Sequence, residues 1–242
     1  MEVLFIRHGE SVSNQWSKYN IHGNPQKDTS LYHDSPLSNY GKNECYSVRP
    51  LTHDDADVVF VSPLTRALNT ASIICRNIKN KVYVLREVSE FEKICKNNKI
   101  NSFSNSFRNI DELKEKYKSF NWNLIESLSI FRYSKKGYDN DKIQQLLCQF
   151  LVSYLASLKY KKIIIICHGR YINKLMNSYS NYNHDIWPKN CEHIYTVFKN
   201  KWFTFKNRKK YKVGKIKKYK VDNIKLIDNE TLLKAKKLCN NH

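Results

Sequence analysis

The amino-acid sequence predicts an α/β fold, a doubly wound and mostly parallel sheet flanked by helices. Two observations favour this fold: short apolar runs rich in β-branched residues recur along the chain, and segments with helical periodicity separate them. The runs are continuous rather than alternating, which is typical of strands covered on both faces. The 242 residues suffice for one such core, which we place at residues 1–198, followed by a basic C-terminal extension at 199–242.

Four segments are predicted to be strands of this sheet. Val3 to Ile6 stops at Arg-His-Gly, and Val58 to Val61 runs into Ser-Pro. Lys81 to Leu85 runs into Arg-Glu, and Ile163 to Ile166 runs into Cys-His-Gly. Because ligands of parallel α/β sheets bind beyond the carboxyl ends of the strands, these loops are the candidate functional segments.

Helical patterns lie between the strands. Pro63 stands where proline favours the first turn of a helix, and apolar residues follow it at spacings of three or four. Lys142 to Leu158 carries one broad apolar face just before the last strand. Two segments, about 14–35 and 90–138, are polar with weak periodicity, and we expect both to be excursions that border a substrate site.

Net charge, cysteine content and apolar stretches indicate which ligands and which cellular location to expect. The formal net charge of +20 concentrates anionic ligands around the chain without selecting among them. Seven cysteines occur without a Cys-x-x-Cys pair, so neither a disulfide scaffold nor a zinc site is indicated. The start of the chain lacks the pattern of a secretory signal, and no apolar stretch is long enough to span a membrane. We therefore expect a cytoplasmic protein without a transmembrane segment.

Cationic side chains stand at the predicted strand ends. Arg7 and His8 end the first strand, Arg66 lies one turn inside the helix after the second, and His168 ends the last. Because the carboxyl ends of parallel strands meet at one edge, these side chains are expected to surround one small volume. Arginine offers paired donors to phosphoryl oxygens, and a neutral imidazole can attack phosphorus. The pattern therefore predicts a phosphoryl-transfer site.

Two further residues fit an anion site next to this histidine. Gly9 is expected to let the backbone approach the anion, since it has no side chain. A helix starting near Ser11 would direct its free amide groups at the same anion.

Several stretches together resemble the histidine phosphatase superfamily, also called phosphoglycerate mutase-like. They occur in the order of that family across roughly residues 2–198: Arg7-His8-Gly9-Glu10-Ser11, then Asn14, Asp34-Ser-Pro-Leu-Ser-Asn-Tyr-Gly41, Ser62-Pro-Leu-Thr-Arg66-Ala-Leu-Asn-Thr70-Ala71 and Cys167-His168-Gly169. The resemblance implies that His8 is transiently phosphorylated. It implies that Arg7, Arg66 and His168 hold the phosphoryl oxygens, with Asn14 as a further donor.

The resemblance also implies a carboxyl group as general acid and base. Glu87 stands at the family's position for this group, and Glu90, three residues later, is its rival. This residue would protonate the leaving oxygen and later deprotonate water. The scheme needs no metal and no other cofactor, because cationic side chains stabilise the charge.

The substrate class follows from departures within the resemblance. Glycolytic mutases follow the acid with Arg and Tyr-Gly, and residues 87–92 lack that pattern. Cys95 and the later Trp122 look more like a phosphatase-like branch, although Lys96 stands where that branch has Asp. We expect a phosphomonoester hydrolase acting on a phosphorylated small molecule, with a phosphoglycerate mutase-type phosphotransferase as the alternative.

The C-terminal extension offers a function from another class. Residues 199–242 contain fifteen Lys or Arg against three acidic residues. A solvated strand face is the simplest interpretation of the alternating Lys and apolar residues. Binding of RNA or of an anionic surface through phosphate contacts is the alternative, which the interleaved aromatic residues favour. A non-catalytic module that binds phosphate or RNA through this extension therefore stays open as a competing function.

Overall fold

The computed structural model describes residues 1–19, 33–90, 108–127, 141–179, 187–199, 202–207 and 219–220. The strands are β1 (Glu2–Arg7), β2 (Val58–Val61), β3 (Val82–Val84), β4 (Lys162–Cys167), β5 (His193–Lys199), β6 (Trp202–Asn207) and β7 (Tyr219–Lys220). The α-helices are α1 (Val12–Tyr19), α2 (Asn39–Tyr46), α3 (Thr65–Ile74), α4 (Ile110–Lys116), α5 (Leu124–Ser127), α6 (Asp141–Ser157) and α7 (Gly169–Tyr179). Short 3-10 turns lie at Lys79–Lys81 and Arg86–Val88.

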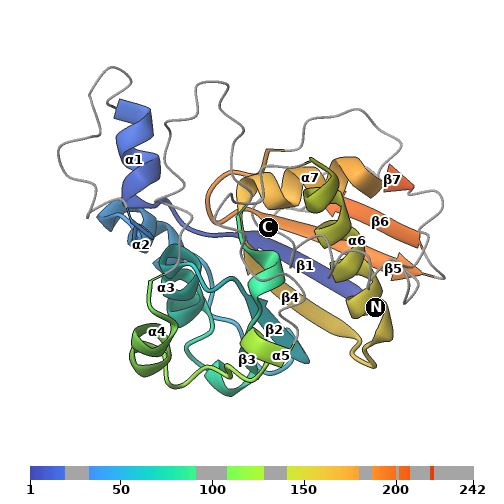
Figure 1. Cartoon of the computed structure of the whole chain (residues 1–242), viewed down its shortest axis with the longest axis horizontal. Coiled ribbons are helices and arrows are strands. Elements are labelled where there is room, and N and C mark those ends of the chain that lie inside the picture. The colour runs from blue at the N-terminus through green and yellow to red at the C-terminus, as the bar shows by residue number, and fades with distance from the viewer. Residues whose placement is uncertain are drawn as a thin grey trace, which may run out of the picture.

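The described strands form one seven-stranded sheet in the order β3-β2-β4-β1-β5-β6-β7. The four predicted strands, β1 to β4, are parallel to one another, whereas β5, β6 and β7 continue the sheet in antiparallel fashion. Figure 1 shows the helices around this sheet. The predicted fold class, a mostly parallel α/β sheet flanked by helices, is therefore confirmed.

The sheet packs against helices on both faces. In β4, Ile163 and Ile165 belong to the core that contains α6 and α7, while Ile164 and Ile166 belong to the core that contains α2, α3 and α4. In Figure 1, α2, α3 and α4 gather on the left, and α6 and α7 lie over the strands on the right. Burial on both faces explains why the strand is a continuous apolar run.

Strand register aligns the loops that carry the cationic residues. β4 lies between β1 and β2, with Arg7 paired to Cys167 and Val61 paired to Ile166. His8 and His168 therefore follow neighbouring strands at the same level. The chain leaves β1 towards the α2 face and leaves β4 towards the α7 face, so the site lies at a topological switch point of the sheet.

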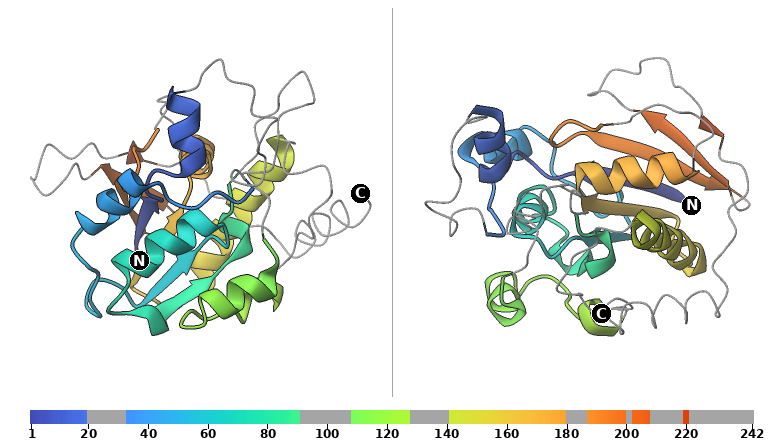
Figure 2. Two further views of the ribbon diagram at one scale, coloured as in Figure 1. Left: turned by 90° about the vertical axis from the view of Figure 1, so that its left-hand side faces the viewer. Right: turned by 45° about the horizontal axis from the view of Figure 1, so that its top comes forward.

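Helices lie in both predicted excursions. The helix expected to start near Ser11 is α1, which begins at Val12 and extends into the segment at 14–35 that was expected to be a loop. Both views in Figure 2 show this dark-blue helix standing outside the sheet. The segment at 90–138 contains α4 and α5. In α4, apolar Ile110, Leu113 and Tyr117 have helical spacing, and the Asn109 side chain caps the helix by accepting a hydrogen bond from Asp111 N at 2.8 Å. The polar residues around these three positions make the short helical pattern hard to recognise in the sequence.

Residues 20–32, 91–107 and 128–140, including Cys95, lie outside the described residues.

The other helices lie close to the predictions. α6 covers 141–157 against the predicted 142–158. α3 begins at Thr65, so Pro63 precedes the helix instead of standing in its first turn. Leu64 between them is extended, with φ −69° and ψ 134°, and therefore separates the proline from the helix.

Only part of the predicted extension is described. Within 199–242, β6 pairs with β5, and β7 pairs with β6. The domain boundary at residue 198 and the binding of RNA by the extension stay predictions. Among the helices described, none has the length and apolar character needed to cross a membrane.

Candidate active site

The ends of β1 and β4 bring two histidines and an arginine together. The ring centroids of His8 and His168 are 5.0 Å apart, with the rings inclined at 59°. Arg66, in the first turn of α3, donates from Nε to His8 Nε2 at 3.2 Å. All three side chains are buried, with exposed fractions of 3% or less. The structure thus brings together the residues that the strand ends were expected to gather.

The hydrogen bonds of His8 fix its tautomer. Its Nδ1 lies 2.6 Å from the carbonyl oxygen of Gly9, which can only accept, so Nδ1 carries the proton. The Arg66 Nε–H can only donate, so Nε2 presents its lone pair. Burial lowers the pKa of His8 well below its usual range, and the charges of Arg66 and Arg7 lower it further. The ring is therefore neutral at physiological pH.

His168 is held by Ser62, which follows β2. His168 Nε2 lies 2.8 Å from Ser62 Oγ, and this oxygen accepts a hydrogen bond from Leu64 N at 3.3 Å. Burial, followed by the charge of Arg66, lowers the pKa of His168 well below its usual range. Its Nδ1 is buried and has no hydrogen-bond partner within the described parts of the chain. A hydroxyl that donates to Nε2 leaves Nδ1–H free to donate to a ligand.

Arg7 is fixed by the loop before β5. Its Nη1 donates to Pro188 O at 2.8 Å, and a Cβ on Gly169 would lie 3.2 Å from its Nε. The absence of a side chain at Gly169 thus lets the guanidinium pack against the start of α7. Burial lowers the pKa of Arg7, while the charge of Glu90 opposes this effect.

Arg66 depends on a cap that comes from a distant segment. The Asp34 carboxylate accepts hydrogen bonds from Thr65 N and Thr65 Oγ1, both at 2.7 Å. Asp34 has φ 46°, in the left-handed region, and it is fully buried. Because Thr65 directly precedes Arg66, this carboxylate fixes the turn from which the guanidinium reaches His8.

Gly9 packs closely against α2. A Cβ there would lie 2.7 Å from Gly41 O and 2.8 Å from Cys45 Sγ, so the backbone packs directly on α2. Gly9 N donates to Thr70 Oγ1 at 3.1 Å, and that hydroxyl donates to Arg66 O at 2.8 Å. The loop that carries His8 is thereby joined to α3.

Ser11 and Asn14 bond to each other at the start of α1. Asn14 N donates to Ser11 Oγ at 3.2 Å, and Ser11 N donates to Asn14 Oδ1 at 3.3 Å. This reciprocal pair caps the helix. It occupies the Asn14 side-chain oxygen, and it joins the residue to the loop of His8.

The two rival carboxylates have different surroundings. Glu87 lies in the turn after β3 and is 3% exposed. The pKa of Tyr154 is raised, mainly because this tyrosine is buried, and the charge of Glu87 raises it further. Glu90 is half-buried; its Oε1 accepts a hydrogen bond from Tyr171 N at 3.1 Å, in the first turn of α7. Glu90 therefore faces the cationic side of the site, near Arg7, as the pKa of that arginine indicates.

Asp34, Ser62 and Thr70 were not predicted as site residues, although all three lie in the stretches that carry the resemblance. Each is fully buried and polar. The position of Ser62, directly after β2, was the one signal in the sequence that could have placed it beside His168.

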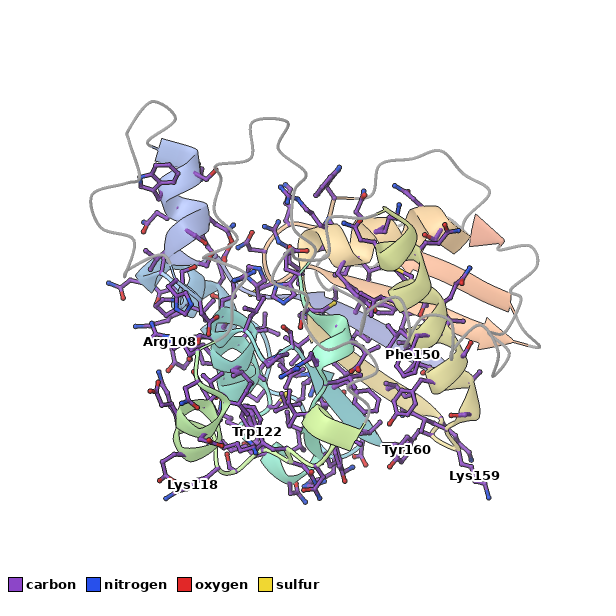
Figure 3. All side chains as sticks on the ribbon, in the orientation of Figure 1. Arg108, Lys118, Trp122, Phe150, Lys159 and Tyr160 are labelled. Atoms are coloured by element: carbon purple, nitrogen blue, oxygen red, sulfur yellow. The ribbon has the colours of Figure 1, made fainter. Side chains whose placement is uncertain are left out.

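Trp122 lies away from these strand-end contacts. Its Nε1 donates to Tyr117 O at 3.2 Å, and its ring packs against the core that contains α3. Figure 3 shows Trp122 near Lys118, with Arg108 at the opposite end of α4. Among the described residues, no group of three or more His, Cys, Asp or Glu side chains is arranged to hold a metal ion.

Solved structures share this fold at low sequence identity. A candidate alpha-ribazole-5'-P phosphatase from Escherichia coli K-12 is 17% identical, with a TM-score of 0.58, covering 88% of this chain and 99% of that one. Phosphoserine phosphatase from Entamoeba histolytica is 16% identical, with a TM-score of 0.51 and coverage of 86% and 98%. Ecdysone phosphate phosphatase from Bombix mori is 16% identical, with a TM-score of 0.52 and coverage of 81% and 89%.

Sequence comparison identifies the family. No curated protein matches the chain significantly. The profile of the histidine phosphatase superfamily (branch 1) matches residues 3–201, a span that runs from β1 to the end of β5 and includes His8, Arg66 and His168. The chain therefore belongs to the histidine phosphatase superfamily.

Proposed function

We propose that the protein is a phosphomonoester hydrolase whose nucleophile is His8. The observation that carries this proposal is the His8 ring itself: it is neutral, its proton is on Nδ1, and its unprotonated Nε2 accepts a hydrogen bond from Arg66 Nε at 3.2 Å. A nucleophilic imidazole needs such an unprotonated nitrogen, and Arg66 frees the Nε2 lone pair when its donors turn to the phosphoryl oxygens of the substrate. Family membership and the solved relatives, each named as a phosphatase, support the same chemistry.

In the first step, the Nε2 lone pair of His8 forms a bond to phosphorus, and the bond from phosphorus to the leaving oxygen breaks. Arg7, Arg66 and His168 donate to the non-bridging oxygens, where charge accumulates. The Nδ1–H of the phosphorylated ring stays bonded to Gly9 O, so a carbonyl dipole stabilises the cationic imidazole.

Glu87 is the proposed acid and base. Its carboxyl group gives a proton to the leaving oxygen in the first step. In the second step, the carboxylate takes a proton from water as that water attacks phosphorus and the bond to His8 Nε2 breaks, releasing inorganic phosphate. Burial of Glu87 suits a proton donor, whereas Glu90 bonds to a helix amide near Arg7, which suits a carboxylate that stays ionised.

The substrate is proposed to be a phosphorylated small molecule. Phosphoserine and ecdysone phosphate, named for two of the solved relatives, differ in everything except the phosphate ester. We therefore propose the class and no single compound. A mutase would pass the phosphoryl group to a second alcohol, and residues 87–92 lack the Arg and Tyr-Gly pattern expected of the glycolytic mutases.

A panel of phosphomonoesters assayed with wild type, His8→Ala and Glu87→Ala tests the proposal. We expect release of inorganic phosphate by wild type in the presence of EDTA, and a loss of at least about 10³-fold in His8→Ala, since this variant has no nucleophile. Glu87→Ala should lose about 10²- to 10⁴-fold, most of all with poor leaving groups. Full activity of His8→Ala, or an absolute requirement for magnesium, would contradict the proposal.

A further inference from the structure

Two cysteine side chains contact each other next to the loop that carries His8. The Sγ atoms of Cys45, in α2, and Cys191, just before β5, are 3.5 Å apart, although 146 residues separate them in the sequence. Cys45 is fully buried, and Cys191 is partly exposed. Cys45 belongs to the core that contains α2 and α3, and Cys191 packs against it. Cys75, Cys148 and Cys167 also lie in the two apolar cores.

We propose that Cys45 and Cys191 form a site of oxidative modification, at which a hydroperoxide produces a disulfide that inactivates the His8 site. The cysteine spacing shows no motif, so this pair was not predicted. Only the packing of α2 against the segment before β5 brings the two sulfur atoms together.

The surroundings of the pair favour a thiolate at Cys45. A hydrogen bond with Cys191 is the largest cause of its lowered pKa; burial and the charge of Glu44 oppose this effect, and the Thr70 hydroxyl and Gly9 amide add to it. Burial alone raises the pKa of Cys75 to about 12. Because the thiolate is the reactive form, the pair is the more reactive site. The same hydrogen bond, together with burial, raises the pKa of Cys191, so the shared proton rests on Cys191, and its transfer to Cys45 across the 3.5 Å contact presents the Cys191 thiolate to the oxidant.

The reaction balances with a hydroperoxide as the oxidant. The Cys191 thiolate attacks the outer oxygen of the hydroperoxide, the O–O bond breaks, and the other oxygen leaves with a proton as water or an alcohol. This gives a sulfenic acid on Cys191. The Cys45 sulfur then attacks the Cys191 sulfur, the S–O bond breaks, and the hydroxyl leaves with the Cys45 proton as a second water.

The disulfide would displace the catalytic loop. Cys191 N donates to Arg7 O at 3.1 Å and to His8 O at 3.4 Å, so the backbone of Cys191 holds the loop from one side. Cys45 Sγ packs against Gly9, where a Cβ would lie 2.8 Å away, and holds it from the other. A disulfide needs a separation of about 2.05 Å, so the sulfurs must approach by about 1.5 Å. A shift of about 1 Å at a catalytic group can cost about 10²-fold in rate.

Peptide mapping after exposure to hydrogen peroxide tests the modification. The folded, full-length protein is oxidised, its remaining thiols are alkylated, and the unreduced digest is analysed by mass spectrometry. We expect one linked pair of peptides that contains Cys45 and Cys191 and is lighter by two hydrogen atoms than the sum of the two. Because mapping needs no substrate, its outcome is independent of the proposed hydrolase activity. Absence of this linked pair would overturn the proposal.

Activity measurements test the consequence. Phosphate release by the oxidised wild type should fall at least about tenfold and return when dithiothreitol is added. Cys45→Ser and Cys191→Ser, each compared with its own untreated sample, should keep their activity in peroxide. Cys75→Ser, a matched variant at a buried cysteine outside the pair, should respond as wild type does. Equal inactivation of the Cys191→Ser variant and wild type would contradict the assignment.

Discussion

At the scale of single residues, two buried histidines with fixed hydrogen bonds define the site. His8 is oriented by Gly9 O and Arg66 Nε, and His168 by Ser62 Oγ. Both rings have a lowered pKa because burial disfavours the imidazolium and Arg66 repels it. The same environment thus keeps both imidazoles neutral and leaves the cationic charge to the arginines.

These lowered pKa values predict how stability depends on pH. Below about pH 6.5 the unfolded chain binds protons at these histidines, whereas the folded protein does not. The free energy of unfolding therefore decreases as the pH is lowered. The slope is up to about 1.4 kcal/mol per pH unit for each histidine, until the pH reaches its folded pKa.

Urea denaturation between about pH 7.5 and about pH 5.5 measures this dependence. His8→Gln should reduce the slope because it removes one of the histidines whose pKa burial lowers; His193 is another and contributes in the same direction. His53→Gln, at an exposed histidine, should leave the slope unchanged. A slope in His8→Gln equal to that of wild type would show that His8 does not titrate as described.

Ser62→Ala tests the orientation of His168. The variant loses the hydroxyl 2.8 Å from His168 Nε2, so the ring is free to adopt the other tautomer. We expect kcat to fall about tenfold or more, with KM changed less, because the loss falls on transition-state stabilisation. Ser72→Ala removes a hydroxyl that bonds only within α3 in the described contacts, to Leu68 O at 2.9 Å, and should keep full activity. Equal activity of both variants would show that Ser62 does not orient His168 for the reaction.

At the scale of secondary-structure elements, α3 is positioned by a residue far away in the sequence. Its preceding residue, Leu64, forms no side-chain cap, and the carboxylate of Asp34 takes over that role at Thr65. The segment around Asp34 is thus part of the support for Arg66.

Asp34→Ala should destabilise the fold by about 1–3 kcal/mol, since it removes a helix cap and leaves buried donors without a partner. It should also lower kcat, because Arg66 follows the uncapped residue. Thermal denaturation and the phosphate-release assay measure the two effects. Asp111→Ala, at an exposed carboxylate in the first turn of α4, serves as the control. If both variants lose equal stability, Asp34 is not the cap that fixes α3.

The four parallel strands and two of the helices, α3 and α6, were predictable because their patterns are local. The Ile163 to Ile166 run and the apolar face of residues 142–158 identify β4 and α6 without any knowledge of the rest of the chain. The start of α1 was expected near Ser11, and the helix begins at Val12. α4 was missed because it is short and polar, and a capping residue rather than an apolar face marks its start.

The gathering of His8, Arg66 and His168 followed from the parallel strand ends, whereas their partners did not. The contacts of Asp34 with Thr65, Glu90 with Tyr171 and Cys45 with Cys191 join segments far apart in the chain. Such contacts depend on how helices dock on the sheet, which no local pattern specifies.

At the scale of the whole molecule, the sheet order accounts for the location of the site. β4 lies between β1 and β2, so the residues that follow these three strands reach one volume at the edge between two cores. The loops from β1 and β4 turn to opposite faces, which opens the space that a phosphoryl group would occupy. Arg7, Arg66 and the neutral histidines thus lie together at the carboxyl ends of these strands, where the proposed phosphate site is located.

The central claim is that His8 carries the phosphoryl group, and detection of the phosphoenzyme tests it most directly. Wild-type protein and Glu87→Ala are mixed with a phosphomonoester that turns over, quenched without acid, and analysed by mass spectrometry. We expect phosphate on His8, at Nε2, with more of it in Glu87→Ala because hydrolysis of the phosphoenzyme is slowed. Phosphate on another residue, or rapid turnover with His8 never phosphorylated, would contradict it.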